Sequence, residues 1–203
     1  MLQEVTNRIG AVVLAAGLSS RMGAQKLLLP WKDSNVICTV VDTLLNIGLE
    51  KIVVVTGRDV EMINDTLSGK NVETAFNTDF ANGNMVTSLV AGLHLLQGRV
   101  DAVLMVLGDQ PQMEKATVEC LILAWKKQPL SLCIPSWQMR RGHPWVIPTD
   151  YWEYLFAMSP EETMRDFIRR HEHKIHYVLV DTPTILADLD TPEDYQKTGG
   201  GGK

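Results

Sequence analysis

Apolar runs alternate with amphipathic stretches through most of this chain. The apolar runs are rich in Val, Ile, Leu and Ala, which is typical of strands that are buried on both faces. The four runs are residues 9–14, 51–56, 72–76 and 102–107. The segments between and after them that follow a helical period are residues 36–47, 60–67, 85–96 and 115–127. This order predicts a mostly parallel central sheet with helices on both faces and right-handed crossovers.

The last third of the chain is less regular. We expect a strand at residues 130–134 that Pro135 interrupts, and a helix that begins at a Ser159 cap and ends near His171. A final apolar run, residues 175–180, predicts a strand near the edge of the sheet. At 203 residues the chain suits a single α/β domain over residues 1–198. The Gly-rich residues 199–203 are expected to be a flexible tail or a cloning remnant.

The loop that follows the first strand has the composition of an anion-binding site. A run of small residues ends at Gly17, and the lack of bulky side chains lets a ligand approach the backbone there. Arg21 and Lys26 add two positive charges that can bind a polyphosphate. A Walker A loop is excluded, because five residues separate Gly17 from Gly23 rather than four. The pattern also argues against a nicotinamide dinucleotide, because Ser19 replaces the second glycine of the dinucleotide fingerprint.

Acidic residues stand where parallel strands bind ligands. Asp109 follows the fourth apolar run directly, and a carboxylate at that edge of the sheet offers hard oxygen atoms to Mg²⁺. Near the C-terminus, Asp188 and Asp190 project to the same side if the backbone is extended, so either can add a second carboxylate to the metal. Asp190 also suits a plain helix cap before Thr191 and Pro192.

Four motifs occur in the order that a known family shows. They are Leu-Ala-Ala-Gly-x-Ser-x-Arg-Met-Gly-x-x-Lys at residues 14–26, a Gly83 to Leu93 segment with Thr87, Ser88, Leu89 and Gly92, Gly-Asp-x-Pro at residues 108–111, and Asp-x-Asp-Thr-Pro-Glu-Asp at residues 188–194. With these motifs the chain resembles the nucleotidyltransferases with a MobA-like fold, a single-domain Rossmann-like nucleotidyltransferase fold. The resemblance covers nearly the whole chain.

The resemblance implies roles for individual residues. Catalysis would use Arg21, Lys26 and Asp109, and the Mg²⁺ cofactor would be held by Asp109 and Asp190, which the family motif favours over Asp188. The nucleotide would be bound by Leu14, Ala15, Ala16, Gly17, Lys26, Gly83, Ser88 and Asp109. The segment at Gly83 to Ser88 also suits an ordinary helix cap, because Asn84 and Thr87 can cap without a ligand.

The branch of the family is suggested by Ala16 and by the Lys-Leu-Leu-Leu-Pro run at residues 26–30. These look like the cytidylyltransferases that act on molybdopterin. The resemblance then implies Mg²⁺-dependent transfer of CMP from CTP to the phosphate of molybdopterin, with release of pyrophosphate. Three alternatives stay open. One is a transferase of the same fold that uses GTP or a sugar-phosphate acceptor, and another is a non-catalytic carrier that delivers molybdenum cofactor to a molybdenum hydroxylase. The third is a plain phosphate-binding protein, which would not release pyrophosphate. A transient contact with such a hydroxylase is part of the expectation.

A further motif, Arg-Arg-Gly-His-Pro, resembles the family's element beside the second substrate. It implies acceptor binding by Arg140, Arg141, Gly142, His143 and Pro144. The two arginines suit an anionic group such as a terminal phosphate, although paired arginines on a hairpin are also often merely solvated. His143 is expected to make local hydrogen bonds, because a phosphate nucleophile is already ionised near neutral pH and needs no general base.

Composition and charge limit the binding partners and the cellular compartment that we expect for this protein. The net charge of -5 argues against a broad nucleic-acid-binding surface. The three cysteines are widely spaced and have no zinc-ligand spacing, which is typical of free thiols in a reducing compartment. The three histidines between residues 171 and 176 alternate with charged residues and suit a solvated surface. With no apolar run of membrane-spanning length and no signal peptide at the N-terminus, we expect a cytoplasmic protein with no membrane partner.

Overall fold

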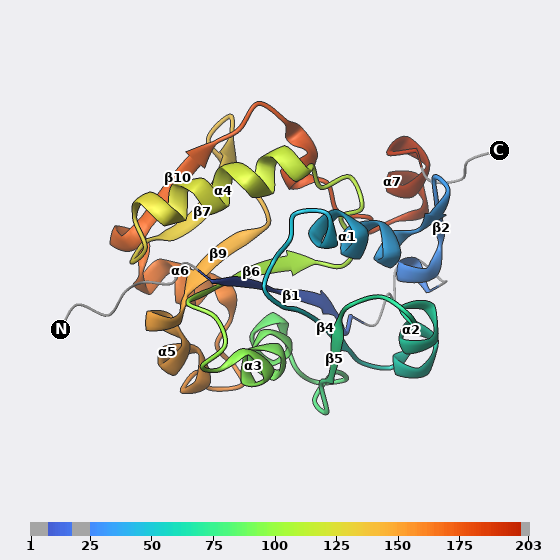
Figure 1. The fold of residues 1–203 in the computed structure, drawn as a ribbon, viewed down its shortest axis with the longest axis horizontal. Helices are drawn as coiled ribbons and strands as arrows, with labels where there is room; N and C mark the ends of the chain where they lie inside the picture. Colours follow the sequence, from blue (N-terminus) through green and yellow to red (C-terminus); the bar gives the residue numbers. More distant parts are fainter. Residues whose placement is uncertain (1–7, 18–24, 200–203) are drawn as a thin grey trace.

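An eight-stranded sheet runs through the centre of the molecule, here described by a computed structural model over residues 8–17 and 25–199 (Figure 1). The strand order is β10-β7-β9-β6-β1-β4-β5, and β8 pairs with β7. The strands are β1 (Ile9–Ala15), β4 (Ile52–Thr56), β5 (Glu73–Phe76), β6 (Ala102–Leu107), β7 (Leu132–Trp137), β8 (Arg140–Arg141), β9 (Trp145–Pro148) and β10 (Ile175–Leu179). Only β8 and β9 run antiparallel to their neighbours in this sheet, so the predicted mostly parallel α/β fold is confirmed.

Helices cover both faces of the sheet. In Figure 1, α1 and α4 lie above it and α3 and α5 below it. The helices are α1 (Val36–Leu45), α2 (Val60–Thr66), α3 (Met85–Leu96), α4 (Lys115–Lys127), α5 (Trp152–Phe156), α6 (Met164–Arg170) and α7 (Pro192–Lys197). Short 3₁₀ turns are η1 (Lys26–Leu28), η2 (Thr149–Tyr151), η3 (Glu172–Lys174) and η4 (Pro183–Leu186), and β2 (Pro30–Trp31) pairs with β3 (Ser34–Asn35) in a small hairpin.

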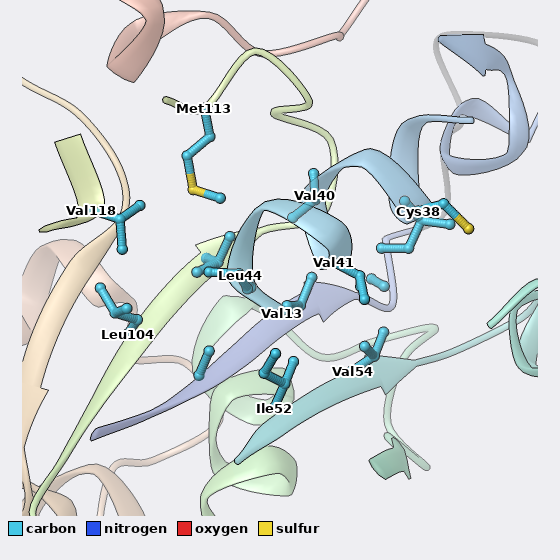
Figure 2. Close-up of a cluster of buried hydrophobic side chains, with 14 of the residues drawn as sticks. Val13, Cys38, Val40, Val41, Leu44, Ile52, Val54, Leu104, Met113 and Val118 are labelled. Carbon is cyan, nitrogen blue, oxygen red and sulfur yellow. The ribbon is translucent and has the colours of Figure 1, made fainter. Parts of the chain in front are cut away.

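Each face of the sheet has its own hydrophobic core. On the upper face, Leu44 of α1 belongs to the same buried cluster as Val13 and Val54 of the sheet (Figure 2). On the lower face, α3 lies so close to the sheet that a Cβ at Gly92 would stand 2.5 Å from a methyl group of Val12. The side chains on the two faces of β1 therefore enter different cores, which explains why the strand is a continuous apolar run.

The strand order reverses at β1. The chain passes from β1 to β4 and β5 on one side and then returns to β6 on the other side. The register pairs Ala15 with Thr56 and Leu14 with Leu107, so the carboxyl ends of β1, β4 and β6 share one edge of the sheet. A crevice at such a reversal is the usual ligand site of an open α/β sheet.

The prediction that Pro135 interrupts the fifth strand is wrong. β7 runs through Pro135, whose carbonyl accepts the N–H of Gly142 at 3.0 Å. Proline provides no N–H for the return bond, and the carbonyl of Gly142 instead accepts the Nε1–H of Trp145 at 2.6 Å. A side-chain donor from β9 thus replaces the missing backbone donor.

The prediction of a helix that begins at Ser159 is also wrong. The N-cap of α6 is Thr163, in a capping box with Asp166, and the preceding helix α5 was not predicted. Residues 159–162 form a turn in which the carboxylate of Glu162 accepts the N–H of Ser159 at 2.8 Å. Two cap-like patterns lie four residues apart in the sequence, and the packing of Phe167 in the lower core favours the second.

Candidate active site

A cavity of about 470 Å³ lies at the carboxyl ends of β1 and β6. Its volume is in the range of sites that bind small molecules. It is lined by the end of β1, by the loop and helix start after β5, and by acidic residues from two distant parts of the chain. The lining residues are Leu14, Ala16, Gly17, Asn77, Phe80, Ala81, Gly83, Asn84, Met85, Ser88, Leu107, Asp109, Asp188 and Asp190.

Lys26 joins two of these acidic residues. Its Nζ atom lies 2.5 Å from Oδ2 of Asp109 and 3.2 Å from Oδ1 of Asp190. The lysine side chain is only 12% exposed, against 21% for Asp109 and 47% for Asp190. Burial lowers the pKa of Lys26, but the charge and hydrogen bond of Asp109, with those of Asp190, outweigh this effect and raise the pKa overall. The ammonium group is therefore charged at neutral pH.

Asp188 lies at the same cavity but has a different partner. Its Oδ1 atom accepts the Nε2–H of Gln110 at 2.7 Å. Burial raises the pKa of Asp188; the hydrogen bond from Gln110 opposes the rise, and the negative charges of Asp109 and Asp190 add to it. Asp188 and Asp190 thus both face the predicted site, and only Asp190 shares Lys26 with Asp109.

The carboxylates fit a hard divalent cation. Asp109 and Asp190 already converge on one cation, the Lys26 ammonium group, and they provide only oxygen ligands. Mg²⁺ is commonly bound by one or two carboxylates together with substrate phosphates and water. Within residues 8–17 and 25–199, no group of three or more His, Cys, Asp or Glu side chains is arranged to hold a metal. The two carboxylates therefore suit a metal ion whose other ligands come from the phosphates of a bound substrate.

Asn77 also lines the cavity, although it belongs to none of the motifs of the sequence. Its Nδ2 group donates to Ser88 Oγ at 3.0 Å and to Thr87 Oγ1 at 3.3 Å, and the side chain is buried. A Cβ at Gly83 would lie 2.3 Å from Thr87 Oγ1, so the loop can close on α3 only with glycine there. The sequence signal for Asn77 was its position directly after β5, at the same edge of the sheet as Asp109.

Helix α7 holds the acidic C-terminal segment against the loop that carries Lys26. The hydroxyl of Tyr195 donates to the carbonyl of Pro30, and the Tyr195 ring lies 6.2 Å from the buried ring of Trp31. The helix begins with a capping box between Thr191 and Asp194. Thr191 is therefore the N-cap of α7, so the Asp190 carboxylate does not cap the helix and lines the cavity instead.

The predicted acceptor motif divides into two groups. Arg141 and His143 line a second cavity of about 650 Å³, which shares Met85 with the first. Arg140, Gly142 and Pro144 line neither of these cavities. A Cβ at Gly142 would lie 2.2 Å from the carbonyl oxygen of Ile185, so this glycine is where the hairpin packs against η4.

Other predicted residues have simpler positions. Ala15 ends β1, where it is buried and pairs with Thr56, and it does not line the first cavity. Arg21 lies outside the described residues, as does the rest of the 18–24 segment. Within the described chain, no helix is both long enough and apolar enough to cross a membrane.

The class of protein follows from the fold, the site and one family comparison. Residues 11–175 match the model of the MobA-like NTP transferase domain, and the chain belongs to this family. The protein is therefore a nucleotidyltransferase. The matched region includes lining residues of both cavities, among them Leu14, Asp109 and His143, but it ends before Asp188 and Asp190.

Individual relatives refine this comparison. The chain is 27% identical over 188 residues to the molybdenum cofactor cytidylyltransferase of Escherichia coli K12, which covers 92% of this chain and 93% of the relative. It is 26% identical over 192 residues to the nicotine blue oxidoreductase of Paenarthrobacter nicotinovorans, with 91% and 93% covered. The crystal structure of Rv0371c from Mycobacterium tuberculosis H37Rv superposes with a TM-score of 0.82 at 23% identity, with 95% of this chain and 97% of that chain covered. The same mycobacterial protein has been solved in complex with manganese.

Proposed function

We propose that this protein transfers CMP from CTP to the phosphate of molybdopterin and releases pyrophosphate, in a reaction that depends on Mg²⁺. The observation that carries the proposal is the convergence of Asp109 and Asp190 on Lys26 beside a cavity of nucleotide size. The E. coli relative, named a molybdenum cofactor cytidylyltransferase, supports the choice of nucleotide and acceptor.

The chain's own residues would contribute binding, position and charge. Ala16 and Gly17 line the cavity at the end of β1, where a base and ribose can lie against small residues. Lys26, with Arg21 from the preceding loop, would neutralise phosphate charge as pyrophosphate leaves. Because the attacking phosphate is already anionic, the site needs no general base, and its work is positioning and electrostatic stabilisation.

Asp109 and Asp190 are the residues that would hold Mg²⁺. A bound divalent ion would offset part of the negative charge of the nucleotide phosphates and would polarise their phosphoryl oxygen atoms as a Lewis acid. Lys26 occupies the space between the two carboxylates, so we expect its ammonium group to shift toward the phosphates when the nucleotide and metal bind.

The first experiment is an equilibrium titration of the purified protein with CTP, GTP, ATP and UTP, each with and without Mg²⁺. We expect a preference for CTP that requires Mg²⁺ and is lost in Asp109→Ala. Asp150→Ala is the matched control, because Asp150 is exposed and follows β9 at the opposite edge of the sheet. Pyrophosphate release with molybdopterin as acceptor then tests the transfer itself.

Each other outcome has a definite meaning. A preference for GTP would replace the proposed nucleotide, and transfer to a sugar phosphate would replace the proposed acceptor. Binding of molybdenum cofactor without any nucleotide binding would favour the carrier function. Reduction of a substrate without pyrophosphate release would place the chain functionally beside the nicotine blue oxidoreductase instead.

A further inference from the structure

The second cavity combines an apolar floor with a positively charged rim. Met164 and Ile168 of α6 are each 5% exposed and form part of its lining. Met85, at the start of α3, lines both cavities, so a ligand in the second one would lie next to a ligand in the first. Apolar surface with a few polar groups at its edge is the usual composition of a small-molecule site.

Among the described residues, three arginines and a single acidic residue, Glu172, line this cavity. Arg169 is paired with Asp166 at 2.8 Å. The side chains of Arg141 on β8 and Arg165 on α6 are exposed, and they have no hydrogen-bond or ion-pair partner among the residues that the structure describes. Two guanidinium groups from separate elements that face one cavity without a counter-charge favour an anionic ligand, which an arginine can bind through two parallel hydrogen bonds.

One wall of the cavity is flat and aromatic. The rings of His143 and Trp145 are stacked, with centroids 4.7 Å apart and planes 11° from parallel. The Nε1–H of Trp145 is already satisfied by the carbonyl of Gly142, so the indole offers the cavity apolar surface rather than a donor. Nδ1 of His143 is buried and has no hydrogen-bond partner within the described part of the chain.

We propose that the second cavity binds an anionic, planar heteroaromatic compound, and that Arg165 selects for the negative charge on it. The inference rests on the proposed function, because such a compound would be the body of the acceptor, whose reacting phosphate extends past Met85 toward Asp109. Arg165 belongs to none of the motifs that identify the family. Through Arg165, helix α6 would determine which class of substrate the cavity binds, together with the Arg-Arg-Gly-His-Pro element.

Pterin-6-carboxylate is the probe, because it is flat, fluorescent and anionic but carries no phosphate that could enter the first cavity. Its fluorescence anisotropy would be measured against protein concentration, with and without saturating CTP and Mg²⁺. We expect binding in both conditions. In Arg165→Gln the affinity should fall by at least about tenfold, the loss expected for one charge-assisted hydrogen bond. Unsubstituted pterin should bind more weakly and should not distinguish Arg165→Gln from the wild type.

Arg170→Gln is the matched control, because Arg170 lies on the same helix but does not line the cavity and pairs instead with Glu162. This variant should bind the probe as the wild type does. Arg165→Lys, which keeps the charge but loses the planar fork, should fall between the wild type and Arg165→Gln. Thermal melts of all variants separate loss of binding from loss of folding.

The inference is overturned if the probe does not bind, if CTP displaces it, or if folded Arg165→Gln binds it with wild-type affinity. The proposed function is judged separately, by CTP binding to the same preparations. A protein that binds CTP but not the probe would contradict only the present inference. A protein that binds the probe but no nucleotide would contradict the proposed function and leave the pterin-carboxylate site in place.

Discussion

The Nζ atom of Lys26 lies 2.5 Å from Oδ2 of Asp109, although 83 residues separate them in the chain. The two residues follow β1 and β6, which are neighbours in the sheet, so the contact exists only when the sheet has formed. Both side chains are largely buried, and their pairing holds the Lys26 ammonium group against a carboxylate at the edge of the cavity.

This pairing predicts a large catalytic effect of Lys26. In Lys26→Ala we expect kcat for pyrophosphate release to fall by roughly 10²–10³, the usual loss when one electrostatic stabiliser is removed. The double variant Lys26→Ala/Asp109→Ala should lose less than the product of the single losses, because the residues act together. Lys127→Ala, at the exposed end of α4, serves as the control. Turnover of Lys26→Ala within a few-fold of the wild type would remove Lys26 from the mechanism.

A second prediction separates Asp190 from Asp188. Asp190→Asn should raise the Mg²⁺ concentration for half-maximal activity by about tenfold or more, because a carboxylate ligand is replaced by a neutral amide. Asp188→Asn should change it much less, since an amide oxygen can still accept from Gln110. Steady-state rates over a magnesium series give both values. The opposite ranking would make Asp188 the ligand.

A third prediction concerns stability in acid. Burial lowers the pKa of His143 from 6.5 to about 4, so between these values the unfolded chain binds a proton that the folded chain does not. Stability should therefore fall as the pH drops from 6.5 toward 4. This histidine should account for about 2 kcal/mol of the difference in unfolding free energy between pH 7 and pH 5.

His143→Phe tests this, because it keeps an aromatic ring beside Trp145 and removes the titration. Urea unfolding at pH 5 and pH 7 gives the comparison, and other groups cancel because they are present in both proteins. We expect the variant to lose less stability in acid than the wild type. Equal losses in the two proteins would show that His143 does not carry this part of the pH dependence.

A fourth prediction concerns the contact between Tyr195 and the Trp31 hairpin. Tyr195→Phe removes the hydrogen bond to the carbonyl of Pro30 but keeps the ring near Trp31, and should cost about 1 kcal/mol of stability. Tyr195→Ala removes both of these contacts of α7, so it should also lower kcat by moving Asp190 away from Lys26. The check is chemical denaturation together with steady-state kinetics. An unchanged kcat in Tyr195→Ala would show that Asp190 is placed without α7.

Sequence pattern alone was sufficient for the regular part of the fold. The predicted bounds of α3, β6 and α4 agree with the structure, and β1 and β4 differ by one residue at an end. These elements are either buried on both faces or clearly amphipathic, so their side-chain pattern reflects their environment directly. The same pattern placed Asp109 at the carboxyl edge of the sheet, because a residue that follows a parallel strand can lie nowhere else.

Tertiary contacts decided what local pattern could not. A donor from Trp145 lets β7 continue through Pro135, and core packing selects Thr163 over Ser159 as the cap of α6. The meeting of Lys26 with Asp190 likewise spans 164 residues, so no local pattern encodes it. Arg165 is the clearest example of a residue whose position the sequence does not predict, because the residues around it are typical of an exposed helix. Its charge reaches a cavity only because α6 folds beside residues 141–145. Sequence specifies which side chains are available, and long-range packing determines which of them share a site.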